Sequence, residues 1–138
     1  MDQVAQLSKA ALLKEIYATF KRGDVETFSQ YFDDDSILKE ADSLPYGGTH
    51  RGRAAIMAIM AEIPTHYSSF TFDIHEVAEG GDLVMAYGTM AVTSAKTGKS
   101  AKFSLAEVWE IIDGRVKMVE AIYGDTKMLM DALSPDPA

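Results

Sequence analysis

The chain has 138 residues, a length that suits one domain with a genuine core. Apolar residues make up 47% of it and charged residues 25%, as in ordinary globular proteins, and the net charge is −8. Because the basic residues form only short, separate groups, this charge argues against a nucleic-acid partner. With no cysteine, disulfides, thiol nucleophiles and Cys-ligated zinc are excluded together.

Two features of the sequence predict a cytoplasmic protein without a membrane partner. The first residues, MDQVAQLSKAALLKEIY, are acidic and polar where a signal peptide requires a positive start and an unbroken apolar stretch. No apolar run approaches the ~20 residues that span a bilayer. We therefore expect one domain over residues 1–138, with its core at about 8–133.

The first half of the chain predicts three helices. The first is indicated by apolar residues at helical spacing, namely Leu13, Ile16, Tyr17 and Phe20. A second, short helix follows Gly23-Asp24 and is expected to end in the acidic triplet 33–35. After a short strand at Ile37–Glu40 and a Pro-Tyr-Gly-Gly loop, a third helix runs to Pro64.

Beyond Pro64 the apolar spacing changes from helical to alternating. Four strands are predicted, separated by glycine-containing turns, and a last short helix is expected over Thr126–Leu133. The strands are Phe70–Ile74, Leu83–Thr93, Lys102–Ile112 and Arg115–Tyr123. Helices early and strands late predict an α+β fold, in which a curved antiparallel sheet forms a cone packed against the N-terminal helices. Such a cone is either filled by side chains or kept as a pocket.

Three segments carry a resemblance to a known family. GDVETFSQYFDDDSIL, LPYGGTHRGRAAI and AEVWEIIDGRVKMVEAIYGDT resemble the SnoaL-like branch of the nuclear transport factor 2 superfamily, which also contains bacterial ketosteroid isomerases, scytalone dehydratase and limonene epoxide hydrolase. The resemblance runs from about Leu13 to Leu133 and implies a cystatin-like cone. It leaves function open, because this scaffold hosts isomerases, hydrolases, cyclases and proteins without chemistry.

The resemblance implies two catalytic carboxyl groups. In the isomerases a carboxylate base ends the first strand, and the matching residue here is Glu40. A protonated carboxylic acid on the penultimate strand matches Glu107 when Trp109 and the following turn are aligned, whereas an alignment without a gap puts Ala106 there. The isomerase tyrosine of the first helix falls at Ile16, one residue before Tyr17, which departs from the isomerase pattern.

The resemblance also implies a set of wall residues. A tryptophan that SnoaL-like proteins often have near the end of the first strand is replaced here by Leu38. On the last strand the pocket-lining positions are Val119, Ala121 and Tyr123.

Strand alternation independently singles out Glu107. It is the one charge on a strand face otherwise formed by Phe103, Leu105, Trp109 and Ile111. A carboxyl group on such a face loses hydration, so its pKa should rise, as a proton donor near neutral pH requires. The alternatives are an ion pair with a Lys or Arg, or a strand that faces a dimer partner.

The other candidate residues also have two interpretations. Glu40 is either a solvated charge at a strand end or a base aimed into the pocket, since Ile37 and Leu38 leave the strand phase ambiguous. Tyr17 is a core tyrosine or a group that orients a carbonyl. Tyr46 and His50 flank the double glycine on a loop expected over the cone mouth, where either binds substrate or anchors the loop.

No metal or cofactor is predicted. The three histidines, His50, His66 and His75, lack the close spacing of metal ligands, and no serine lies in a Gly-x-Ser-x-Gly elbow. Any catalysis is therefore expected to be cofactor-free.

Two functions remain open from the sequence. The first is a SnoaL-like pocket protein that binds a small apolar carbonyl compound and has isomerase or cyclase activity. In this activity Glu40 would be the base, Glu107 the neutral donor and Tyr17 an orienting group. Its walls are expected to be Leu38, Trp109, Val119 and Tyr123. The alternative is a non-catalytic ligand carrier or interaction module that forms a homodimer through the sheet face, where Ala106, Val108 and Met118 lie.

Overall fold

The structure is a computed structural model that describes residues 7–136. Residues 1–6 and 137–138 lie outside this part. The expected cytoplasmic location rested partly on the first of these segments, and the second is the end of the expected domain. Within it, no helix is both long and apolar enough to cross a membrane.

The predicted helices are present in the predicted order. Ser8 begins the first one by accepting a hydrogen bond from the Ala11 N–H (3.1 Å), and Asp24 begins the second by accepting from the Thr27 N–H (3.2 Å). Pro64 lies in a 3₁₀ turn that ends the third. The elements are α1 (Lys9–Lys21), α2 (Val25–Gln30), α3 (Arg53–Glu62), the turn η2 (Ile63–His66) and α4 (Thr126–Leu133).

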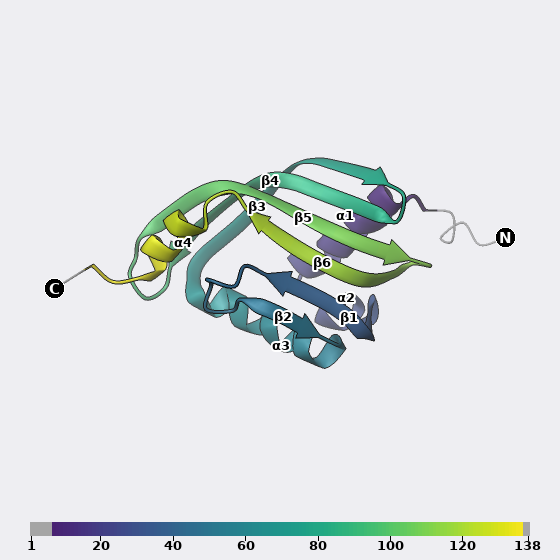
Figure 1. Cartoon of the computed structure of the whole chain (residues 1–138), viewed down its shortest axis with the longest axis horizontal. Coiled ribbons are helices and arrows are strands. Elements are labelled where there is room, and N and C mark those ends of the chain that lie inside the picture. The colour runs from purple at the N-terminus through teal and green to yellow at the C-terminus, as the bar shows by residue number, and fades with distance from the viewer. Residues whose placement is uncertain (1–6, 137–138) are drawn as a thin grey trace.

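The strands form one curved sheet of six strands in the order β2-β1-β6-β5-β4-β3 (Figure 1). β3 to β6 make the predicted antiparallel meander, but β1 and β6 pair in parallel, so the sheet is mixed. The α+β class with a curved sheet is confirmed. The strands are β1 (Phe32–Glu40), β2 (Gly48–Arg51), β3 (Tyr67–Gly80), β4 (Leu83–Ser94), β5 (Ser100–Ile112) and β6 (Arg115–Tyr123).

The acidic triplet 33–35 lies in β1 and not at the end of a helix, which corrects the sequence prediction. Asp33 bonds to Arg115 and Lys117 of β6, each at 2.6 Å. These contacts bring a charged segment, which has no strand propensity of its own, alongside β6. The β1–β6 register shifts between Phe32 and Ile37, so alternation in β1 is broken where the sequence left its phase ambiguous.

β2 was not predicted, because the segment after the double glycine was interpreted as loop. It pairs antiparallel with β1, and Leu38 lies opposite His50. His50 is therefore on an edge strand, where its Nε2 lies 3.1 Å from the carbonyl oxygen of Tyr46. The strand is short and half exposed, which explains why it lacks an apolar pattern.

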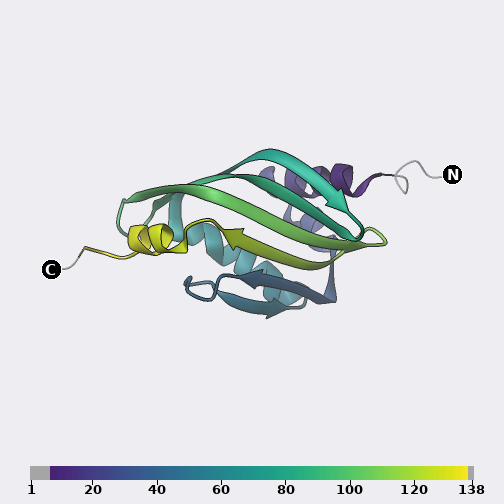
Figure 2. The ribbon, with the colours of Figure 1, turned by 45° about the horizontal axis from the view of Figure 1, so that its top comes forward.

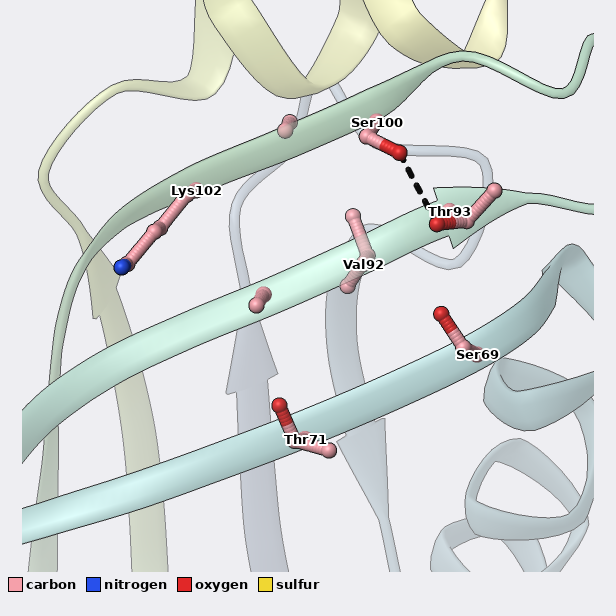
Figure 3. Close-up of a pocket in the computed structure, with 8 residues that line it drawn as sticks. Ser69, Thr71, Val92, Thr93, Ser100 and Lys102 are labelled. Carbon is pink, nitrogen blue, oxygen red and sulfur yellow. Dashed lines mark hydrogen bonds between the residues drawn. The ribbon is translucent and has the colours of Figure 1, made fainter.

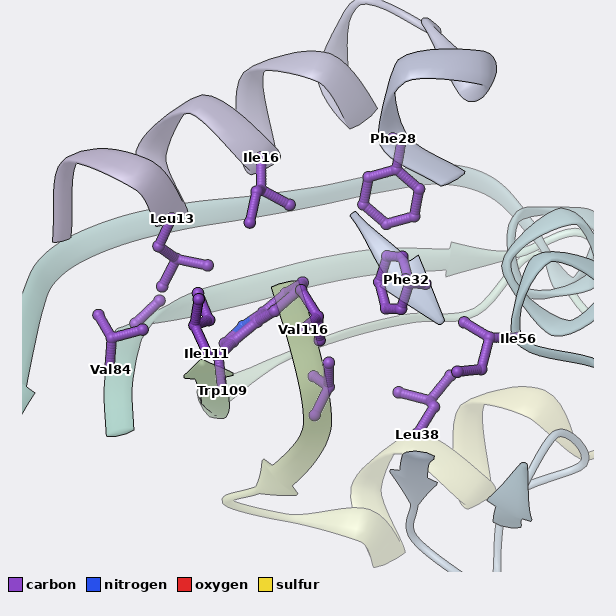
Figure 4. Close-up of a cluster of buried hydrophobic side chains, with 12 residues drawn as sticks. Leu13, Ile16, Phe28, Phe32, Leu38, Ile56, Val84, Trp109, Ile111 and Val116 are labelled. Atoms are coloured by element: carbon purple, nitrogen blue, oxygen red, sulfur yellow. The ribbon is translucent and has the colours of Figure 1, made fainter. Parts of the chain in front are cut away.

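The core joins the helices to the inner, concave face of the sheet. Figures 1 and 2 show α1, α2 and α3 on this side, and Figure 4 shows Leu13 and Ile16 of α1 directed at the strands. Both are fully buried, as is Val84 of β4, and burial of each contributes about 1.5–3 kcal/mol. Phe28 and Phe32 pack with ring centroids 5.2 Å apart.

Candidate functional site

A cavity of about 570 Å³ lies between the helices and the concave face of the sheet. Its size falls within the range of small-molecule sites, and its wall is mainly apolar and aromatic with a few polar groups. The lining residues come from every layer of the fold: Tyr17, Phe20, Lys21, Phe28, Phe32, Leu38, Glu40, Tyr46, Ile56, Met60, Ile63, Phe70, Thr71, Phe72, Asp73, Ile74, Met90, Glu107, Trp109, Val119 and Tyr123.

Glu107 projects from β5 into this cavity and is bonded to the first helix. The hydroxyl of Tyr17 donates to Glu107 Oε1 at 2.6 Å, and the indole Nε1–H of Trp109 donates to the Tyr17 oxygen at 2.9 Å. Burial raises the pKa of Glu107, and the hydrogen bond from Tyr17 offsets part of that rise. Burial and the nearby carboxyl also raise the pKa of Tyr17, which keeps its hydroxyl protonated.

Glu40, the last residue of β1, also faces the cavity and is only 9% exposed. The hydroxyl of Tyr123 donates to Glu40 Oε1 at 2.7 Å. Burial raises the pKa of Glu40 to about 7, the bond from Tyr123 acts in the opposite direction, and the charge of Glu107 adds to the rise. Among the described residues, neither carboxyl group belongs to a salt bridge.

The strand register places the two carboxyl groups on either side of one small residue. In the β1–β6 pair Lys39 lies opposite Glu120, so the next residue, Glu40, comes beside Ala121. From β5, Glu107 pairs with the same Ala121. Since neighbouring strands are about 4.8 Å apart, the two glutamate Cα atoms are separated by roughly 10 Å.

A pair of buried tyrosines adjoins Glu40. The hydroxyls of Tyr46 and Tyr67 lie 2.5 Å apart, and the two residues are 3% and 7% exposed. Burial raises the pKa of both, and Glu40 raises it further. Sequence reasoning missed Tyr67, because its contact with Tyr46 depends on how the loop and η2 fold back.

Most of the residues predicted for the site line the cavity. These are Tyr17, Leu38, Glu40, Tyr46, Glu107, Trp109, Val119 and Tyr123. His50 and Ala121 are not among the lining residues. The strand of His50 extends the edge of the sheet and its ring bonds to the Tyr46 carbonyl, and Ala121 is buried in the core. The chemical roles assigned to all of them remain predictions.

The aromatic wall was only partly foreseen. Phe70, Phe72 and Ile74 of β3 line the cavity, and their alternation in the sequence was the available signal. Phe20 and Phe28, from α1 and α2, were interpreted only as helix core. A core residue and a cavity-lining residue have the same spacing, so no sequence pattern separates them.

Two further observations concern a metal site and a second depression in the described part of the chain. No three His, Asp or Glu side chains of this part gather in a group that would hold a metal ion. A second depression, about 350 Å³, lies over β3, β4 and β5 and contains the hydroxyl pair Thr93–Ser100 (2.9 Å) and Lys102 (Figure 3). Apart from Lys102 it has no titratable lining residue.

Residues 13–119 match the family model of the SnoaL-like domain. The chain belongs to the SnoaL-like domain family. This membership agrees with the resemblance seen in the sequence and with the helix-covered curved sheet. No curated protein matches the chain significantly.

Solved structures share the fold over nearly the whole chain. TerC, co-crystallised with polyporic acid, is 27% identical with a TM-score of 0.78, over 88% of this chain and 95% of TerC. An NTF2-like protein of unknown function from Burkholderia pseudomallei K96243 is also 27% identical (TM-score 0.80, 89% and 95%). An LEH-like epoxide hydrolase from M. tuberculosis, at 18% identity (TM-score 0.68, 90% and 87%), is similar in fold alone.

Proposed function

We propose that this SnoaL-like protein binds a small, largely apolar carbonyl compound in its cavity and catalyses cofactor-free proton transfer on it, as an isomerase or cyclase does. The observation that carries the proposal is the pair of desolvated carboxyl groups, Glu40 and Glu107, on one apolar cavity. The likeness to TerC, crystallised with polyporic acid, supports a small organic ligand.

The proton transfer uses the two carboxyl groups in different states. Glu40, ionised above a pKa of about 7, removes a proton from the carbon next to the carbonyl group. The electron pair of that C–H bond moves into the carbonyl, whose oxygen becomes an enolate oxygen. Glu107 acts in its protonated form, which burial favours by raising its pKa, and donates a hydrogen bond to this oxygen. Glu40 then returns the proton to the same or another carbon.

Deuterium exchange tests this activity without knowledge of the natural substrate. 2-Tetralone is an apolar bicyclic ketone with acidic C–H protons, and NMR in D₂O follows their exchange. We expect the protein to accelerate exchange above the buffer rate and Glu40→Gln to abolish the acceleration. Glu120→Gln is the matched control, since Glu120 lies on the neighbouring strand with its side chain on the opposite face. Equal exchange with Glu40→Gln and the unaltered protein would exclude Glu40 as the base.

A second candidate, a homodimer through the convex sheet face, is favoured by exposed apolar residues. Met85, Tyr87 and Ile122 are 42%, 51% and 49% exposed on that face. They lie in register, because Ala106 of β5 pairs with both Tyr87 and Ile122. Large exposed apolar patches are typical of protein–protein contacts.

Sedimentation velocity tests the dimer. We expect the protein to sediment as a dimer at micromolar concentration and Ile122→Glu to sediment as a monomer. Val25→Glu is the control, because Val25 is 65% exposed on α2, away from the sheet face. A monomer for the unaltered chain at these concentrations would contradict the proposal.

A further inference from the structure

We infer that the cavity takes an apolar ketone with a carboxylate at the end opposite its carbonyl group, and that Lys21 at the cavity mouth binds this carboxylate. The inference rests on the proposed function, whose carbonyl compound it narrows to keto acids, and it adds the residue that selects and orients them. Three observations support it: the place where the cavity opens, the position of Lys21 on α1, and the charges around the opening.

The cavity opens to solvent between the end of α1 and the free edge of the sheet. Of its described lining residues only Lys21, Thr71 and Asp73 are exposed, and we call them the mouth. Five consecutive residues of β3, 70–74, line the cavity, so it reaches the edge of this end strand and not only one of its faces. The loop where the sequence predicted the mouth contributes only Tyr46, which is buried.

The helical spacing places Lys21 outward from the proton-transfer groups. Tyr17, which donates to Glu107 at 2.6 Å, lies four residues before Lys21. The two side chains therefore share a face of α1 and are about 6 Å apart along the helix axis. A ligand whose carbonyl group lies at Glu107 thus has the ammonium group of Lys21 about one helical turn further out, at its other end.

The ammonium group of Lys21 is available to a ligand. Lys21 is the one basic residue among the described lining residues, and it forms no salt bridge with any described residue. Two acids near it have other neighbours: the Asp73 carboxylate lies 4.0 Å from His75 Nδ1, and the Asp24 carboxylate lies 3.5 Å from Arg22. An anionic ligand group can pair with Lys21 without displacing a protein contact.

The two ends of the cavity consequently favour different ligand groups. The inner part contains Glu40 and Glu107 and no basic residue, so a carboxylate that entered first would lose hydration beside other carboxyl groups. At the mouth the same carboxylate stays partly hydrated and lies beside a cation. A keto acid is therefore held with its carbonyl group at the carboxyl pair, and Glu40 stays free to act as the base.

Two probes that differ only in charge test the inference. A lysine in the last turn of a helix also stabilises that helix through its dipole, but this structural role does not distinguish an anionic from a neutral ligand. The probes are 6-oxo-5,6,7,8-tetrahydronaphthalene-2-carboxylate and its carboxamide, which have the ketone and the second group at opposite ends of two rings. Calorimetry at pH 7.5 measures their affinities, and the indole N–H resonance of Trp109 reports binding in the cavity.

We expect the carboxylate to bind about three- to tenfold more tightly than the carboxamide at low salt, as a charged contact at a partly exposed site provides. Salt at about 0.5 M should reduce this preference, because it screens exposed charges. Lys21→Gln should abolish the preference and Lys21→Glu should reverse it, with little change for the carboxamide. Lys14→Gln is the matched control, since it removes the same charge from an exposed position of α1 that does not line the cavity.

The outcomes separate this inference from the proposed function. If both probes bind equally, if neither binds, or if Lys21→Gln has no more effect than Lys14→Gln, the role of Lys21 is wrong, while exchange of 2-tetralone still decides on proton transfer. If the carboxylate is preferred through Lys21 but neither probe nor 2-tetralone exchanges its C–H protons faster than in buffer, the ligand class stands and the proposed catalysis fails.

Discussion

Tyr17 and Glu107 join the first helix to the fifth strand through a 2.6 Å hydrogen bond between residues 90 positions apart in the chain. The bond lies in the cavity, and Trp109 extends it by donating to the same tyrosine oxygen at 2.9 Å. Folding therefore brings a proton donor and its orienting groups together only when helix and sheet pack.

Replacing Tyr17 by Phe should raise the pKa of Glu107 further. The tyrosine hydroxyl stabilises the ionised carboxylate, so its removal leaves burial unopposed. The variant should also lose about 1–3 kcal/mol of stability, because Trp109 Nε1 loses its acceptor. Carboxyl-detected NMR titration and urea unfolding measure the two effects. Tyr31→Phe, outside the cavity, is the control, and an unchanged Glu107 titration in Tyr17→Phe would contradict the prediction.

Stability should fall as pH rises, because of Glu40. Its pKa rises from 4.5 to about 7 on folding, so between these values the folded state binds more protons than the unfolded state. The stabilisation is complete below pH 4.5 and is lost as pH rises through 7, by up to about 3 kcal/mol. Urea unfolding at pH 5 and pH 8 should show this loss, and Glu40→Gln should reduce it. If Glu40→Gln and the control Glu120→Gln have the same pH dependence, the prediction is wrong.

Ser36 should stabilise the parallel β1–β6 pair. Its fully buried hydroxyl donates to the Val116 carbonyl at 2.6 Å and accepts from the Asp33 N–H at 2.8 Å, where the strand register shifts. Ser36→Ala leaves these groups without partners and should cost about 1–3 kcal/mol in urea unfolding. Ser43→Ala, at an exposed position, is the control. A loss no larger than that of the control would mean that the shifted register holds without the serine.

Much of the fold could be predicted from the sequence, and so could the orientation of one of the two carboxyl groups, that of Glu107. β5 alternates without a break, so its pattern alone put Glu107 on the same face as Trp109. The orientation of Glu40 could not be predicted in this way, because β1 has a register shift and two adjacent apolar residues. Its inward orientation depends on the pairing with β6, which is parallel and was not predicted.

The contacts that complete the site were beyond sequence reasoning. Tyr123 reaches Glu40 across 83 residues, and Tyr46 meets Tyr67 only after η2 turns the chain. β2 has four residues and no apolar alternation, so its pairing with β1 supplies the stability that its own composition lacks. Such contacts are set by tertiary packing, and a linear pattern does not encode them.

The proposed proton transfer requires that Glu40 and Glu107 are desolvated in one cavity, and a carboxyl-detected NMR titration of both groups measures this. We expect Glu40 to titrate near pH 7 and Glu107 to titrate above the ordinary 4.5. If both groups titrate near 4.5, they are solvated and the proton-transfer mechanism is wrong.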